Sequence, residues 1–186
     1  FLTPTRGHIH YNGREITGSR PAAIARMGLV RSFQISAVFP NLNVHENVRI
    51  ALQRRHGHSF DFWRSESKLA MHNGRALELI DAVGLTEFAH TQAIELPYGR
   101  KRALEIATTL ALDPEMMLLD EPTAGMTHED VARITALIRK VAANRTVLMV
   151  EHNLSVVSRL SDHITVLARG EVLAEAPGSE QRVLSV

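Results

Sequence analysis

The run Met-Met-Leu-Leu-Asp-Glu-Pro at residues 116–122 constrains the fold more strongly than any other part of this chain. Its four apolar residues are unbroken, which is typical of a strand buried inside a parallel sheet. Such a strand would end at Asp120 and Glu121, and open α/β sheets bind ligands at the carboxyl ends of their strands. Two adjacent carboxylates there suit a Mg²⁺ ligand followed by a base that polarises water. Taken alone, the run fits equally well an acidic strand–loop junction that has no catalytic or metal-binding role.

The remaining sequence supplies the other elements of an α/β fold. A second apolar strand is expected at 146–150, and a helix at 129–143 separates it from the first strand, which is the order of a parallel βαβ unit. Further strands are expected at 8–11, 29–34, 164–168 and 171–174, and further helices at 22–27, 43–56, 68–83 and 100–112. Asn12-Gly13 and Arg169-Gly170 indicate hairpin turns, and Asn43 is a possible N-cap of the helix at 43–56. We therefore expect one domain over residues 1–186, with a helical subdomain at about 43–100 interrupting a parallel-sheet core.

Composition excludes several classes of protein. The net charge is +1, which argues against a broad nucleic-acid-binding surface. There is no cysteine, which excludes disulfides and thiolate metal sites. No apolar run approaches the roughly 20 residues of a membrane span, and the first residues do not form a signal peptide. The chain opens with Phe1 rather than methionine, so we expect that it begins inside a longer gene product.

Two loops ahead of the acidic run carry groups that could reach a phosphate or a metal-bound water. Gln34 ends a predicted strand, although a lone glutamine is usually a solvated loop residue. Residues 96–100 read Leu-Pro-Tyr-Gly-Arg and precede the predicted helix at 100–112. A glycine ahead of a helix leaves amide hydrogens free, and the helix dipole adds positive charge, so such an end binds anions. A plain turn that starts a helix is the alternative.

Residues after the second apolar strand could face the same site. His152 follows the strand at 146–150, and because that strand neighbours the first, its side chain could point toward Glu121. A structural or merely exposed histidine is the alternative, and Glu151 beside it reads as a supporting or surface acid. The loop at 124–127 could contact a partner subunit or serve only as a linker.

In order and spacing, these segments resemble the nucleotide-binding subunit of an ATP-binding cassette (ABC) transporter over essentially the whole chain. They are a Gln loop at Gln34, a signature at 96–100, a Walker B motif at 116–121, a D-loop at 124–127 and a switch histidine at His152. The resemblance implies an α/β fold, a P-loop NTPase-like ABC ATPase core with a helical subdomain.

The local sequences are most similar to ATPase subunits that serve importers of branched-chain amino acids and other hydrophobic amino acids or amides, and urea-type importers are close. The similar segments are residues 31–34, 44–48, 96–99 and 104–107.

The sequence also departs from the family pattern. No G-x-x-x-x-G-K-[ST] phosphate loop occurs in residues 1–186, so we expect an N-terminally truncated cassette whose phosphate loop lies upstream of Phe1. Alone, such a chain should bind ATP poorly and be inactive, and its sheet should have an exposed edge. Pro97 replaces the usual signature serine, Arg100 the usual glutamine, and Thr127 the usual D-loop aspartate.

The resemblance implies roles for these residues in hydrolysis of ATP with Mg²⁺. Asp120 would help to hold Mg²⁺, mainly through water, and Glu121 would polarise the attacking water. His152 would contact the γ-phosphate, and Gln34 would link the metal site to the membrane subunit. The signature of the opposing subunit, with Tyr98, Gly99 and Arg100, would complete each nucleotide site.

The implied partners are transmembrane permease subunits, a second ATPase subunit and, indirectly, a solute-binding protein, with the chain peripheral to the cytoplasmic face of the membrane. The sequence does not identify the solute.

A non-catalytic truncated cassette, a pseudo-ATPase that docks to a membrane partner, is the alternative, and the missing phosphate loop favours it. A soluble cassette ATPase of DNA repair or translation is a third hypothesis, but the chain has neither coiled-coil insertions nor tandem cassettes.

Overall fold

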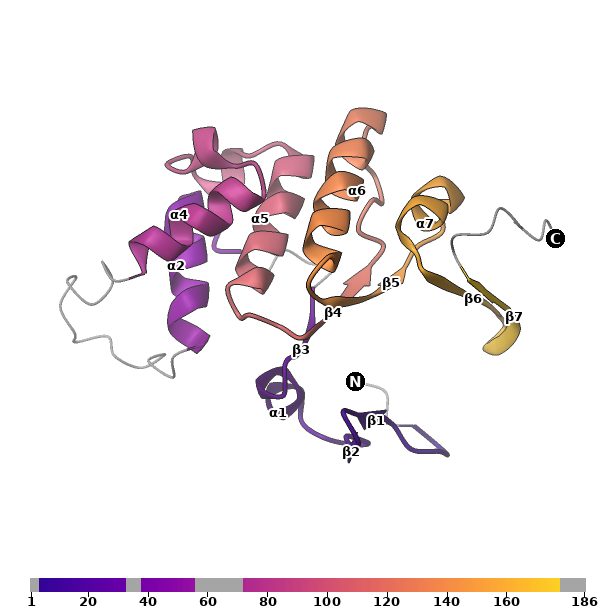
Figure 1. Cartoon of the computed structure of the whole chain (residues 1–186). Coiled ribbons are helices and arrows are strands. Elements are labelled where there is room, and N and C mark those ends of the chain that lie inside the picture. Colours follow the sequence, from indigo (N-terminus) through magenta and orange to yellow (C-terminus); the bar gives the residue numbers. More distant parts are fainter. Residues whose placement is uncertain (1–3, 33–37, 56–71, 178–186) are drawn as a thin grey trace.

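Three parallel strands form the central sheet (Figure 1). In order across the sheet they are β3 (Leu29–Arg31), β4 (Met116–Asp120) and β5 (Thr146–Val150). The computed structural model describes three stretches of the chain, residues 4–32, 38–55 and 72–177. Met117 in β4 lies opposite both Val30 of β3 and Val147 of β5. The two apolar runs are therefore neighbouring parallel strands, as predicted, and their carboxyl ends meet at one edge of the sheet.

Two long helices, α5 (Tyr98–Leu110) and α6 (His128–Ala142), lie side by side against the sheet (Figure 1). They bury Met117 and Leu119 of β4 in the same core as Ile134 of α6. Helix α6 is where the apolar periodicity predicted it. Helix α5 begins two residues earlier than predicted, because Pro97 has the backbone geometry of an N-cap and its carbonyl accepts from the amides at positions 100 and 101.

A second group of helices packs beside α5 and shares its hydrophobic core. Its members are α2 (Val44–Arg55), α4 (Asn73–Ala82) and the short 3₁₀ turns η1 (Thr86–Phe88) and η2 (Ala93–Glu95). Asn43 caps α2 as predicted: its Oδ1 accepts from the Glu46 amide at 2.8 Å, and the Glu46 carboxylate accepts from the Asn43 amide at 2.8 Å. The division into a subdomain at 43–100 stays a prediction, because one core joins these helices to the sheet.

Two antiparallel hairpins lie outside the central sheet. They are β1 (His10–Tyr11) with β2 (Arg14–Glu15), and β6 (His163–Ala168) with β7 (Glu171–Pro177). The first turns at Asn12 and Gly13, which both have positive φ, as this type of tight hairpin turn requires. Both hairpin turns were predicted from their sequence. A helix after β1–β2, α1 (Pro21–Arg26), was also predicted, whereas α7 (Leu154–Leu160) was not.

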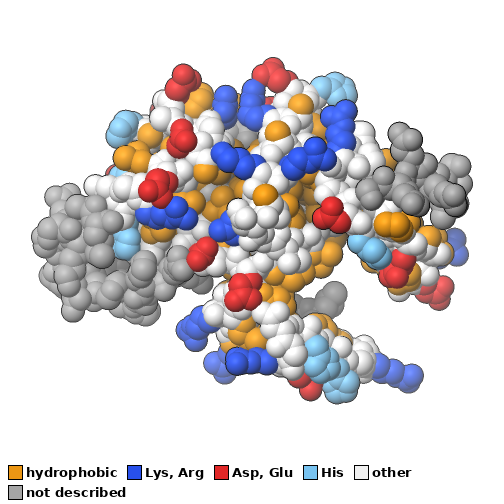
Figure 2. Space-filling model, in the orientation of Figure 1, with side chains coloured by type: hydrophobic (Ala, Val, Ile, Leu, Met, Phe, Trp, Pro, Cys, Tyr) orange, Lys and Arg blue, Asp and Glu red, His pale blue; other side chains and the backbone are white. Residues whose placement is uncertain are grey.

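One face of the central sheet is uncovered within the described part of the chain. Side chains of β5 alternate: Val147 and Met149 face the helices, whereas Leu148 is 55% exposed and Val150 is 63% exposed. Figure 2 shows hydrophobic side chains at the surface below the block of helices, in the region where Figure 1 places the strands. Among the described residues, no helix has the length and apolar character needed to cross a membrane.

Candidate functional site

The carboxyl edge of the sheet holds the two adjacent acids. Asp120 is the last residue of β4, and the amide of Glu121 donates to the carbonyl of Val150 at 2.8 Å, which extends the pairing with β5 by one residue. Glu121 has a φ of +43°, a left-handed conformation that side chains other than glycine rarely adopt. Such strain costs about 1–3 kcal/mol and persists only where the surroundings hold it. The backbone therefore turns the Glu121 side chain out of the strand direction.

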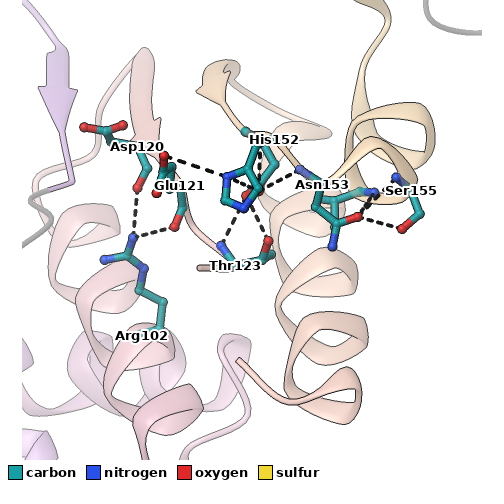
Figure 3. Close-up of polar contacts among 9 residues, drawn as sticks. Arg102, Asp120, Glu121, Thr123, His152, Asn153 and Ser155 are labelled. Atoms are coloured by element: carbon teal, nitrogen blue, oxygen red, sulfur yellow. Dashed lines mark hydrogen bonds and ion pairs between the residues drawn. The ribbon is translucent and has the colours of Figure 1, made fainter. Parts of the chain in front are cut away.

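His152 lies across from Glu121, as the neighbouring strands predicted. Its Nδ1 atom is 3.8 Å from Oε1 of Glu121, and the two side chains are 72% and 41% exposed. Figure 3 shows the imidazole above the loop that carries Glu121. The structure thus brings together a carboxylate and an imidazole that both reach solvent at the same edge. Their chemical roles stay a prediction.

Arg102 of α5 supports the backbone beneath these residues, and sequence reasoning missed it. Its Nη2 donates to the carbonyls of Asp120 at 3.0 Å and Glu121 at 3.3 Å (Figure 3). Its Nη1 donates to the Glu105 carboxylate at 2.7 Å, and both side chains of this pair are 8% exposed. The only sequence signal was an Arg and a Glu three positions apart on the helix, which is also the pattern of an exposed pair.

The carboxylate of Glu151 has the supporting position that was one of its two predicted readings. Its side chain is only 1% exposed, and it accepts hydrogen bonds from Thr123, His152 and Asn153. Asn153 in turn caps α7, accepting from the amides of Ser155 and Val156. Glu151 is therefore a buried support of the site and not a surface acid.

Asp120 fits the part of a single protein ligand to Mg²⁺. Its carboxylate is 28% exposed at the sheet edge and pairs with Arg31, whose Nη2 lies 2.7 Å from Oδ2 of Asp120. Among the described residues, no three acidic, histidine or cysteine side chains gather in a way that could hold a metal ion. Mg²⁺ usually takes one or two carboxylates and completes its shell with phosphate oxygens and water. The donors present therefore fit an ion that arrives with a phosphate substrate.

The signature segment differs from its expected form. Gly99 was expected ahead of the helix with free amides, but it lies buried in the first turn of α5. A Cβ atom on Gly99 would lie 2.5 Å from the Asp130 carboxylate of α6. Arg100 was expected to help complete the nucleotide site of the opposing subunit. Its Nη1 instead donates to the Gly84 carbonyl at 2.9 Å, and its guanidinium lies 5.0 Å from the centre of the Phe88 ring.

The positions of three further predicted site residues differ in how they relate to the prediction. Tyr98 is 56% exposed at the start of α5 and is available for contact. Thr127, at the end of the predicted D-loop, caps α6: its hydroxyl donates to the Asp130 carboxylate at 3.1 Å and accepts from the Asp130 amide. Gln34 lies outside the described residues.

Residues 1–124 match the protein-family model described as ABC transporter. The chain belongs to the ABC transporter family. The predicted nucleotide-binding cassette is thus confirmed, and the chain is an ABC-type transport ATPase subunit.

Curated relatives cover nearly the whole chain. It is 36% identical to the high-affinity branched-chain amino acid transport ATP-binding protein BraF of Pseudomonas aeruginosa, over 98% of this chain and 74% of that protein. It is 33% identical to LivG of Escherichia coli, which carries the same description, over the same shares of the two chains.

Solved cassettes share the fold. The ATP-binding cassette MJ1267 of an ABC transporter superposes with a TM-score of 0.79 and 26% identity, over 95% of this chain and 72% of that one. The cassette MJ0796, solved as a dimer in a post-hydrolysis state with ADP and Pi, gives a TM-score of 0.75 at 24% identity, over 96% of this chain and 76% of that one. The α/β cassette architecture is therefore confirmed.

Proposed function

We propose that this chain energises an importer of branched-chain amino acids or related amides by binding and hydrolysing ATP. The observation that carries the ATPase assignment is the approach of His152 to Glu121 at the end of two neighbouring parallel strands. The importer class is supported by relatives whose names describe branched-chain amino acid transport.

Three side chains at the carboxyl edge of the sheet have separate proposed roles in ATP hydrolysis. The Glu121 carboxylate reaches solvent and would accept a hydrogen bond, and then a proton, from the water that attacks the terminal phosphorus. His152, also exposed, would donate a hydrogen bond to an oxygen of that phosphate. Asp120 would hold Mg²⁺, chiefly through water, once it exchanges its pairing with Arg31. The bound Mg²⁺ supplies positive charge that offsets the charge of the phosphates.

The proposed assembly contains two such subunits. Tyr98 and Gly99, and Arg100 if it leaves Gly84, would complete the nucleotide site of the second subunit, and Gln34 would link the metal site to a permease. Dimeric cassettes of the same fold support this arrangement. The other partners proposed are transmembrane permeases and a solute-binding protein, with the chain at the cytoplasmic face of the membrane.

A second candidate is a non-catalytic cassette that docks to a membrane partner without hydrolysing ATP. One observation favours it: Pro97 stands where the family signature usually has a serine, so this position has no hydroxyl to contact a phosphate. The two candidates differ in a directly measurable quantity, which is ATP turnover by the assembled transporter.

The test is ATP hydrolysis and leucine uptake by the transporter purified and placed in lipid vesicles with its solute-binding protein. We expect leucine with its binding protein to raise ATP turnover, and His152→Ala to abolish turnover and uptake together. Leucine uptake without ATP turnover would contradict the proposal. ATP turnover that no branched-chain amino acid raises would also contradict it.

A further inference from the structure

We propose that Glu151 is a positioning residue for hydrolysis, because its buried carboxylate fixes the loop of Glu121 and the loop of His152 relative to each other. The inference rests on the proposed function, in which those two side chains act on ATP and water. The Glu151 side chain is 1% exposed, and its Oε1 also lies 3.8 Å from Nδ1 of the exposed His152 imidazole.

The carboxylate divides its two oxygens between the two loops. Oε2 accepts from the Thr123 hydroxyl at 2.9 Å and from the Thr123 amide at 3.3 Å. Oε1 accepts from the amides of His152 and Asn153, each at 3.2 Å. One side chain therefore satisfies four donors, two on each loop, and Figure 3 shows the two loops facing each other across these bonds.

The backbone between Thr123 and Glu121 is short and rigid. Thr123 follows Glu121 after a single residue, Pro122, whose side chain is fully buried and whose ring fixes its φ angle. A displacement of Thr123 therefore passes to Glu121, which already has a strained backbone at a φ of +43°. On the other loop, the hydrogen-bonded amide of His152 belongs to the residue whose imidazole faces Glu121.

Packing alone does not account for a carboxylate at this place. A buried charge is costly unless hydrogen bonds replace its water, and an apolar side chain of similar volume would avoid that cost. The apolar side chain would, however, leave three amides and one hydroxyl on the two loops without their acceptor. The reactive side chains are exposed, so the loops beneath them must be held from the interior.

The test compares Glu151→Gln with Glu171→Gln in the assembled transporter. Glu171 is an exposed carboxylate at the start of β7 and serves as the matched control. A glutamine at 151 keeps one acceptor oxygen, but its NH₂ group faces N–H donors on one of the two loops and cannot accept from them. We expect kcat for ATP hydrolysis to fall about 10–100-fold, the scale of a displacement of about 1 Å, with KM for ATP nearly unchanged. Glu171→Gln should hydrolyse at the parental rate.

Thr123 tests the same link without removing a buried charge. Thr123→Val should lower kcat and Thr123→Ser should restore it, because serine keeps the hydroxyl that donates to Glu151. If Glu151 acts through Thr123, the combination of Glu151→Gln with Thr123→Val should lose less activity than the product of the two single losses. Multiplicative losses, or a rise in KM equal to the fall in kcat, would overturn the inference.

Glu121→Gln, measured beside these variants, distinguishes a failure of the proposed catalytic site from a failure of the positioning role of Glu151. Parental turnover by Glu121→Gln would refute the proposed catalytic site. Slow turnover by Glu121→Gln together with parental turnover by Glu151→Gln would overturn only the positioning role.

Discussion

The first turns of α5 and α6 touch at Gly99 and Asp130, where a Cβ atom on the glycine would lie 2.5 Å from the carboxylate. The Asp130 side chain has little freedom to move, because it accepts from the Thr127 hydroxyl at 3.1 Å and from Arg133 at 2.7 Å. Gly99 is therefore needed for the close approach of the two helices at the site edge, whatever it contributes to a second subunit.

Gly99→Ala should destabilise the chain by about 1–3 kcal/mol, the usual cost of overpacking. Gly74→Ala is the matched control, since that exposed glycine of α4 has nothing within 4 Å of its Cβ position. The control should gain about 0.4–1 kcal/mol. Urea unfolding of both variants measures the difference, and equal stabilities would show that α6 is not held against Gly99.

The buried Arg102–Glu105 pair gives a second prediction. Arg102→Leu leaves the Glu105 carboxylate unpaired and removes a donor from the carbonyls of Asp120 and Glu121. We expect a loss of about 3–5 kcal/mol, with partial recovery in the double variant that also carries Glu105→Leu.

The exposed pair of Arg75 and Glu78 is the control for this prediction. It has the same helical spacing and the same 2.7 Å distance as the buried pair. Because solvent screens it, Arg75→Leu should cost no more than about 1 kcal/mol. Equal losses in Arg75→Leu and Arg102→Leu would contradict the buried role assigned to Arg102.

The uncovered face of the sheet gives a third prediction, for the 186-residue chain. Leu119→Ala, at a buried position of β4, should cost about 2–5 kcal/mol. Leu148→Ala makes the same chemical change on the exposed face of the neighbouring strand and should cost about 0.5 kcal/mol or less. A large loss at Leu148 in denaturant unfolding would show that another surface covers this face in solution.

His45 near the start of α2 gives a pH-dependent prediction. Burial lowers the pKa of its imidazole, and the charges of Arg49 and His90 act in the same direction, opposed by Glu46. The unfolded chain then binds this proton more readily, so folded-state stability falls as pH drops through the unfolded value of about 6.5. His45→Gln should therefore lose less melting temperature than the parent between about pH 7.5 and pH 5.5. A loss of melting temperature equal to that of the parent would show that His45 does not contribute to the pH dependence of stability.

Much of the fold could be predicted because its signals are local. The apolar run of β4 and the Asn12-Gly13 turn each specify their structure through neighbouring residues alone. The approach of His152 to Glu121 followed from strand order, since parallel strands that are neighbours end at one edge.

The supports of the site depend on contacts between distant segments, which no local pattern reveals. Arg102 is buried because the carbonyls at the end of β4 need donors, yet it reads as an exposed residue of a helix. Glu151 is buried because it meets Thr123 from another loop. Helix α7 has only seven residues, too few for a clear apolar period, and its cap at Asn153 was the one available sign.

The most direct test of the account is single-turnover ATP hydrolysis by the complete subunit with Glu121→Gln, beside a measurement of its ATP affinity. The exchange keeps the shape of the side chain and removes the base, so hydrolysis should slow by about 10²–10⁴-fold while ATP affinity stays at the parental value. Hydrolysis at the parental rate would contradict the assignment of Glu121, and with it the site at the carboxyl edge of β4 and β5.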